Sequence, residues 1–215
     1  MPAQPFDARE LTAISDKTIG HYQNRAKTFW AGTHDHDVSQ NIDTLLSYLE
    51  GEEPASILDF GCGPGRDLVT FRDKGHRPVG LDGAEAFCTM ARELSGQEVL
   101  HQDFLALDLP YERFDGIFAN ATLFHIPMCE IERVLSELFA ALRPRGVLFA
   151  SNPRGPNIEE FNGERYGAYY ELERWRELLG QAGFEELTHY YRPPDLPRDQ
   201  QPWLASAWRK PGVSP

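Results

Sequence analysis

The sequence predicts an α/β fold built on a mostly parallel sheet, and three observations support this prediction. Short apolar runs alternate with longer amphipathic segments from Ala55 onward, which is the pattern of βαβ units. A glycine-rich turn joins the first apolar run to the first amphipathic segment. The chain has 215 residues, of which 41% are hydrophobic, so it can bury one sizeable core. We therefore expect one domain over residues 1–215, with a helical part at 1–54 and an α/β part at 55–215.

Seven strands are expected in the α/β part, each a short run rich in apolar or β-branched residues. In chain order they are Ser56–Phe60, Pro78–Leu81, Glu98–His101, Phe114–Ala119, Gly146–Ser151, Glu185–Tyr191 and Trp203–Arg209. Four amphipathic helices lie between them, and a glycine or a proline follows each one. These helices are Arg66–Lys74, Ala84–Leu94, Cys129–Leu142 and Glu171–Ala182. The proline-rich segment 193–197 is expected to connect the last two strands.

The part before Ala55 has the periodicity of two helices, Lys17–Trp30 and Val38–Leu49. Between them lies HDHD, residues 34–37, which places two imidazoles and two carboxylates in four consecutive positions. Asp37 is expected at the N-cap of the second helix, because Gln40 follows three residues later as in a capping box.

The charge of the chain excludes several classes of partner. Lys and Arg total 21 against 33 Asp and Glu, so the formal net charge is −12, and the basic residues are scattered. Nucleic acid and anionic membranes are therefore not expected partners, and a small molecule is. The N-terminus lacks the pattern of a signal peptide and no apolar run is long enough for a membrane span, so we expect a soluble, cytoplasmic protein.

Neither a metal site nor a disulfide framework is expected. The three cysteines lack CxxC spacing. His34 and His36 would point to opposite sides of an extended chain, and no second cluster of ligands is apparent.

Three acidic and glycine motifs follow the first three expected strands. ILDFGCGPGRD, residues 57–67, is a strand, a glycine turn and a helix start, but it matches neither the dinucleotide pattern GxGxxG nor a P-loop. Asp82 ends the second strand 21 residues after Gly61, where a carboxylate can accept both hydroxyls of a ribose. Asp103 and Phe104 follow the third strand and offer a carboxylate and an apolar face to an adenine.

Together these motifs resemble the cofactor site of class I S-adenosylmethionine-dependent methyltransferases. FDGIFANATLFHIP (114–127) and LRPRGVLFASNP (142–153) are similar to further passages of that family, and the resemblance covers residues 55–210. It implies a Rossmann-like sheet of order 3-2-1-4-5-7-6 with the last strand antiparallel, S-adenosylmethionine as the cofactor, S-adenosylhomocysteine as its product, and an N-terminal helical lid. The expected cofactor-binding residues are Tyr22, Trp30, Asp59, Gly61, Cys62, Gly63, Asp82, Gly83, Asp103, Phe104 and Asn120.

A second resemblance concerns the methyl acceptor. HYQNRAKTFWAGTHDHDVSQNIDTLL, residues 21–46, looks like the start of the methyltransferase domain that completes ovothiol biosynthesis, where the π-nitrogen of 5-mercaptohistidine is methylated. In that enzyme the domain usually ends a long chain that carries an iron-dependent sulfoxide synthase. We expect this chain to act as a stand-alone methyltransferase paired with a separate sulfoxide synthase. Whether the acceptor is the free thiol, its disulfide, or another imidazole or thiol stays open.

A neutral imidazole attacks a methyl group through its unprotonated nitrogen, so the enzyme must mainly fix the tautomer and the position of the ring. Asp35, His36 and His125 are the candidate catalytic residues, and Arg154 or Arg165 is expected to bind the substrate carboxylate. The full set of expected substrate-binding residues is Phe29, His34, Asp37, Asn41, Phe124, Arg154, Arg165, Tyr166 and Tyr169. The alternatives are a methyltransferase for another small thiol, amine or carboxylate, and a regulatory or scaffold protein that binds S-adenosylmethionine without turnover.

Overall fold

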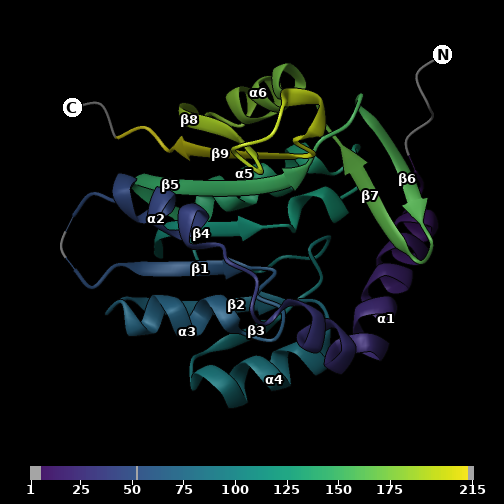
Figure 1. Ribbon diagram of the computed structural model, residues 1–215, viewed down its shortest axis with the longest axis horizontal. Coiled ribbons are helices and arrows are strands. Elements are labelled where there is room, and N and C mark those ends of the chain that lie inside the picture. Colours follow the sequence, from purple (N-terminus) through teal and green to yellow (C-terminus); the bar gives the residue numbers. More distant parts are fainter. Residues whose placement is uncertain (1–5, 52, 213–215) are drawn as a thin grey trace.

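A seven-stranded sheet forms the centre of the computed structural model, which describes residues 6–51 and 53–212 (Figure 1). The strands of this sheet are β1 (Ser56–Phe60), β2 (Arg77–Asp82), β3 (Val99–His101), β4 (Phe114–Asn120), β5 (Leu142–Pro153), β8 (Glu185–Arg192) and β9 (Trp203–Arg209). The helices are α1 (Ala8–Thr33), α2 (Ser39–Tyr48), α3 (Arg66–Asp73), α4 (Glu85–Ser95), α5 (Ile131–Ala141) and α6 (Leu172–Gln181), with short 3-10 turns at Leu123–His125 and Arg198–Gln200.

The order of the strands in the sheet is β3-β2-β1-β4-β5-β9-β8. β1 to β5 pair in parallel, and β9 runs antiparallel to both of its neighbours. Since β8 and β9 are the sixth and seventh expected strands, this is the predicted order 3-2-1-4-5-7-6. The difference from the prediction is an additional hairpin of β6 (Ile158–Asn162) and β7 (Arg165–Tyr169), which follows β5 along the chain and forms a separate two-stranded sheet. The predicted Rossmann-like class and the antiparallel last strand are confirmed.

Side chains of successive residues in a strand point to opposite faces of the sheet, and this alternation divides the core. Ile57 in β1 packs with Ile42 of α2 and Phe71 of α3 on one face. Leu58, the next residue, packs on the other face with α5 and α6, where Leu138 and Trp175 are buried. Helices therefore cover both faces, and in such a sheet a ligand site is expected at the carboxyl ends of the strands.

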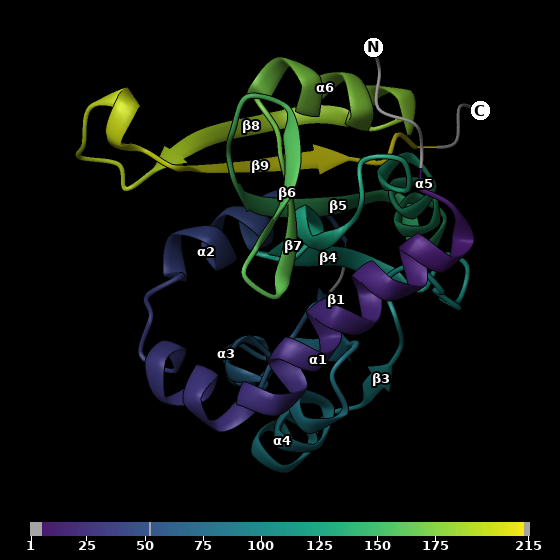
Figure 2. The same cartoon turned by 90° about the vertical axis from the view of Figure 1, so that its right-hand side faces the viewer.

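The hairpin β6–β7 was not predicted, although the chain signals it at Asn162-Gly163. Asn-Gly is a strong hairpin signal because glycine accepts the positive φ that tight turns need. Gly163 has a φ of 66°, and Asn162 pairs with Arg165 across the turn. The hairpin brings Arg165 beside α1, which crosses in front of the carboxyl ends of the strands (Figure 2).

The two N-terminal helices begin elsewhere than predicted. α1 begins at Ala8 because Asp7 and Glu10 form a capping box: the Asp7 carboxylate accepts from the Arg9 and Glu10 amides, and Glu10 accepts from the Asp7 amide. The expected capping box of Asp37 is wrong, since Val38 takes the N-cap position of α2. Asp37 instead accepts from the Ser39 amide at 2.9 Å, a local turn that still satisfies one free N–H of the helix start.

Candidate active site

A cavity of about 690 Å³ opens at the carboxyl ends of β1, β2 and β4, beneath α1 and beside the hairpin. All of the predicted cofactor residues line it except Asp59. Of the predicted catalytic residues, His36 and His125 line it and Asp35 does not. Of the predicted substrate residues, Phe29, Asp37, Phe124 and Arg165 line it, whereas His34, Asn41, Arg154, Tyr166 and Tyr169 do not.

The glycine turn after β1 forms one wall of this cavity. Gly61 has a φ of 80°, and its amide and that of Cys62 donate to the Leu81 carbonyl at 2.8 and 3.0 Å, which ties the turn to β2. A Cβ atom at Gly61 would overlap with the side chain of Thr122, so a larger residue fits neither the backbone nor the space. The turn therefore holds β1 close to the loop after β4, with backbone facing the cavity.

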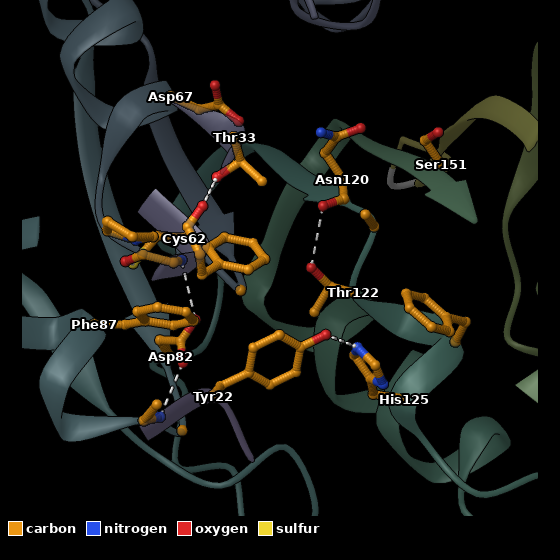
Figure 3. Close-up of a pocket in the computed structure, with 18 of the residues that line it drawn as sticks. Tyr22, Thr33, Cys62, Asp67, Asp82, Phe87, Asn120, Thr122, His125 and Ser151 are labelled. Carbon is orange, nitrogen blue, oxygen red and sulfur yellow. Dashed lines mark hydrogen bonds between the residues drawn. The ribbon is translucent and has the colours of Figure 1, made fainter. Parts of the chain in front are cut away.

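Asp82 lies at the end of β2 with only 8% of its surface exposed (Figure 3). Its carboxylate accepts from the Gly63 amide at 3.0 Å and the Ala84 amide at 2.9 Å. Burial raises the pKa of Asp82 to about 6, and these backbone donors oppose the rise. These backbone donors stabilise the ionised Asp82 carboxylate, which can accept from further donors such as the two hydroxyls of a ribose.

Asp103 and Phe104, which follow β3, lie farther along the same wall. The Asp103 carboxylate accepts from the Ser15 hydroxyl of α1 at 2.7 Å and from the Leu105 amide at 2.8 Å. Phe104 packs on Phe60 with 4.6 Å between ring centroids. Helix α1 is thus joined through Ser15 to Asp103, a residue of the expected adenine site.

Asp59 corrects the predicted cofactor set, since it lies beneath the glycine turn and does not line the cavity. It is 2% exposed, and its Oδ2 atom has no hydrogen-bond partner among the described residues. The pKa of Asp59 is raised well above its usual range, mainly because the carboxyl is buried and also because the Asp67 and Asp82 carboxylates lie nearby. Asp59 is therefore a buried residue at the end of β1 and is not available to a ligand in the cavity.

A chain of two hydrogen bonds faces the Asp82 wall across the cavity. Nδ1 of His125 lies 2.6 Å from the Tyr166 carbonyl, which can only accept, so Nδ1 carries the ring proton. Nε2 is then unprotonated and accepts from the Tyr22 hydroxyl at 2.8 Å (Figure 3). Burial lowers the pKa of His125 to about 4, with Arg165 and His21 contributing in the same direction, so the ring is neutral at neutral pH.

Arg165, at the start of β7, brings a cation to this side of the cavity. Its chain neighbour Glu164 pairs with Arg25 at 2.6 Å and with His21 at 3.2 Å instead. Among residues 6–51 and 53–212, no carboxylate forms an ion pair with Arg165. Burial raises the pKa of Tyr22, and a hydrogen bond from Arg165 and its positive charge oppose this rise, which places the guanidinium close to the Tyr22–His125 pair.

Arg154, the other predicted carboxylate partner, is already engaged. Its guanidinium donates to the Gln201 carbonyl at 2.8 Å and the Arg198 carbonyl at 2.9 Å, and it lies 3.5 Å from the Glu171 carboxylate. These bonds join the end of β5 to the loop before β9. Arg154 therefore does not line the cavity, because its donors bind the protein itself, and a role of Arg154 toward the substrate stays a prediction.

The HDHD segment begins where α1 ends, and its four side chains do not all face the cavity. The exposed His34 points back to the helix, with Nδ1 3.1 Å from the Trp30 carbonyl, and Asp35 is exposed outside the cavity. Only His36 and Asp37 reach the rim. Of the two residues expected to face the acceptor, His36 lines the cavity and Asp35 does not.

Three further predicted substrate residues support the walls from outside the cavity. Asn41 is fully buried, donates to Asn120 at 2.8 Å and accepts from Tyr190 at 2.8 Å. Tyr166 directs its ring into the core, where its hydroxyl bonds Glu159, and offers only its carbonyl to His125. Tyr169 stacks on Phe124 at 6.3 Å. Each acts on a lining residue.

Several lining residues were not predicted. Arg66 and Asp67 of α3, Phe87 of α4, Arg192 at the end of β8, and Trp203 all face the cavity. Arg66 and Asp67 directly follow the glycine turn at the start of α3, so their position in the sequence could have indicated that they face the cavity. Arg192 and Trp203 come from distant strands, and nothing local in the sequence marks them.

The part of the chain that the structure describes shows no metal site and no membrane-spanning helix. There, no three His, Cys, Asp or Glu side chains stand together as a metal site would require. None of the helices in residues 6–51 and 53–212 combines the length and apolar character needed to cross a membrane.

Comparison with known proteins agrees with this geometry. Residues 57–146 match the model of a methyltransferase domain family. Trans-aconitate 2-methyltransferase from Variovorax paradoxus is 35% identical over 141 residues, 64% of this chain and 53% of the relative. Malonyl-[acyl-carrier protein] O-methyltransferase from Enterobacter lignolyticus is 27% identical over 146 residues, 67% of this chain and 53% of the relative. The chain thus spans about half the length of these curated relatives.

The fold is shared with solved structures as well. A 1,6-didemethyltoxoflavin-N1-methyltransferase from Burkholderia thailandensis, crystallised with its acceptor and S-adenosylhomocysteine, superposes with a TM-score of 0.77 at 22% identity, over 98% of this chain and 93% of that one. The glycine turn and the buried Asp82 carboxylate fit S-adenosylmethionine, the predicted cofactor. The chain therefore shares the fold of this S-adenosylmethionine-dependent methyltransferase, and its residues 57–146 match the model of a methyltransferase domain family.

Proposed function

We propose that this chain transfers a methyl group from S-adenosylmethionine to a small molecule whose carboxylate is bound by Arg165. One observation carries the proposal: a guanidinium without an acidic partner in the described residues faces the same cavity as an S-adenosylmethionine site. A half-buried cation in a cavity favours an anionic ligand, because a charge taken from water needs a partner.

The two sides of the cavity have separate tasks in this proposal. On one side, Asp82 holds the ribose, the glycine turn approaches the cofactor, and Asp103 with Phe104 accommodates the adenine. S-adenosylmethionine supplies an electrophilic methyl group on its sulfonium. On the other side, Arg165 fixes the acceptor, and positioning of this kind contributes up to roughly 7–11 kcal/mol in well-oriented reactions.

For the acceptor itself, we propose the π-nitrogen of 5-mercaptohistidine. This finer assignment rests on the resemblance of residues 21–46 to the ovothiol methyltransferase domain. An amino acid offers the carboxylate that Arg165 would bind, and an imidazole offers nitrogens that Tyr22 can meet on the cavity side. A separate sulfoxide synthase would supply this acceptor.

A carboxylate acceptor is the second candidate, and the names of the curated relatives favour it. Trans-aconitate is an acid, and the malonyl enzyme is an O-methyltransferase. In that case Arg165 would hold the carboxylate that receives the methyl group, or a second carboxylate beside it.

Mass spectrometry separates these candidates. The chain is incubated with S-adenosylmethionine and, in parallel, with 5-mercaptohistidine, its disulfide, trans-aconitate and a malonyl thioester. A gain of one methyl on 5-mercaptohistidine supports the finer proposal, and a gain on an acid alone replaces it with the second candidate. Binding of S-adenosylmethionine without transfer to any of them would favour a regulatory or scaffold protein.

The Arg165→Gln variant tests the role of the guanidinium on whichever acceptor is methylated. We expect its KM for the acceptor to rise about tenfold or more, because a charge-assisted pair contributes about 1.5–3 kcal/mol, with unchanged affinity for S-adenosylhomocysteine. Arg176→Gln is the matched control, since Arg176 is an exposed residue of α6 paired with Glu186. An unchanged KM in Arg165→Gln would remove Arg165 from the acceptor site.

A further inference from the structure

We propose that Tyr22 and His125 form a proton-accepting pair for the methyl acceptor, and that an anion bound by Arg165 strengthens this pair. The inference rests on the proposed function and names the class of acceptor: a heterocycle with an N–H group conjugated to the nitrogen that is methylated. A carboxylate has no proton to lose at neutral pH, so it would not need such a pair.

The hydrogen-bond directions leave one free acceptor in the cavity. The Tyr166 carbonyl holds the proton of His125 on Nδ1, and the Tyr22 hydroxyl donates its own proton to Nε2. The Tyr22 oxygen has two lone pairs: the Arg165 guanidinium approaches one of them, and the other can accept from a ligand. Both Tyr22 and His125 line the cavity. The pair therefore selects a ligand that offers an N–H, and it disfavours one that offers only lone pairs.

Methylation of the acceptor releases one proton, which this pair can take up. The acceptor ring becomes more acidic as its other nitrogen gains a methyl group, because the ring acquires positive charge. Its N–H proton moves to Oη of Tyr22, while the Tyr22 proton moves to Nε2 of His125. The acceptor keeps the electron pair of the broken N–H bond and leaves as a neutral ring, and His125 becomes an imidazolium that returns its proton to solvent.

Arg165 connects this pair to the binding of the acceptor. The charged or titratable groups facing His125 are Arg165 from β7 and both His21 and Tyr22 from α1. His21 is itself paired with Glu164. The cation of Arg165 disfavours an imidazolium, so an anion bound there would raise the proton affinity of His125. The base would then be strongest when the carboxylate of the acceptor is in place.

Nitrogen NMR of the protein without acceptor tests the pair independently of any activity. At neutral pH the spectrum of wild type should show His125 with its proton on Nδ1, and Tyr22→Phe should shift the Nε2 resonance toward that of a nitrogen without a donor. Tyr111→Phe is the control, since Tyr111 is 73% exposed. A proton on Nε2, or no response to Tyr22→Phe, would overturn the proposal.

The same spectra followed against pH test the effect of Arg165. In Arg165→Gln the titration midpoint of His125 should rise, by on the order of one pH unit or less. Arg192→Gln should leave it in place, because Arg192 lines the same cavity without being among the charges that act on His125. Equal midpoints in wild type and Arg165→Gln would show that the guanidinium does not control the base.

Kinetics then distinguish a proton acceptor from a merely structural histidine. Glutamine keeps a hydrogen-bond donor and an acceptor but takes no proton near neutral pH. With 5-mercaptohistidine, His125→Gln should lower kcat at least tenfold, leave KM nearly unchanged and remove the acidic limb of the pH profile. A full kcat with the wild-type limb would contradict the proposal. If wild type methylates no acceptor, the proposed function fails, while the NMR result still decides whether the pair exists.

Discussion

The two walls of the cavity are built by different means. The cofactor wall comes from consecutive strand ends, β1 to β3, and from turns that follow them directly. The acceptor wall comes from α1, the turn after β4 and the β6–β7 hairpin, which are far apart in the chain. One wall is therefore specified by short local motifs, and the other by tertiary packing. We infer that the residues of the cofactor wall tolerate few substitutions, whereas substitutions in the acceptor wall can change which acceptor binds.

Asp82→Ala should produce the largest loss on the cofactor wall. It removes two charge-assisted ribose contacts, so we expect affinity for S-adenosylhomocysteine to fall by about 1.5–3 kcal/mol, which is roughly ten- to a hundredfold. Calorimetry measures this change, and circular dichroism checks the fold. Asp103→Ala should cost less, because Ser15 and the Leu105 amide already engage its carboxylate.

Gly61→Ala tests whether the glycine turn is as demanding as its geometry indicates. A φ of 80° is strained for alanine, and the new methyl group would overlap with Thr122, so we expect a loss of about 1–3 kcal/mol in the free energy of unfolding. Gly180→Ala is the matched control. Gly180 is helical with nothing within 4 Å of the added Cβ, so this change should be neutral or stabilise by about 0.5–1 kcal/mol. Equal urea midpoints would show that the turn tolerates a side chain.

The affinity for S-adenosylhomocysteine should depend on pH through Asp82. Its pKa of about 6 lies above the usual 3.8, so below pH 6 the ligand-free protein holds a proton that ribose binding must displace. Affinity should therefore rise with pH, by at most tenfold per unit below about pH 6, and level off above it. Asp82→Asn should remove this dependence. An affinity that falls as the pH rises from 5 to 7 would have the wrong sign.

The smallest effects are expected in the HDHD segment. Asp35→Ala should leave catalytic efficiency unchanged, because Asp35 is exposed and outside the cavity. His36→Ala should lower it by a few-fold at most, through the rim of the cavity. Asp37→Ala should reduce the melting temperature slightly, since the Ser39 amide loses its acceptor. A strong loss of activity in Asp35→Ala would restore Asp35 as a candidate catalytic residue.

The same division explains what the sequence could predict. Gly61, Asp82 and Asp103 could be placed because each is fixed by a few neighbours and by the end of a parallel strand. Arg165 and His125 were named correctly as cavity residues, but their contacts with Tyr22 and Tyr166 were not predicted, because those contacts depend on a hairpin and a helix that pack from elsewhere. Arg154 and Asp35 were expected in the site and do not line the cavity. The direction of a side chain depends on its hydrogen-bond partners, which the residue type alone does not reveal.

The most direct test of the account is a calorimetric comparison of Asp82→Ala and Arg165→Gln in the presence of S-adenosylhomocysteine and then of the acceptor that proves to be methylated. The account predicts that Asp82→Ala weakens binding of S-adenosylhomocysteine and that Arg165→Gln leaves it intact while weakening the acceptor. If both variants weakened S-adenosylhomocysteine alike, or if Arg165→Gln spared the acceptor, the assignment of the two walls to two ligands would be contradicted.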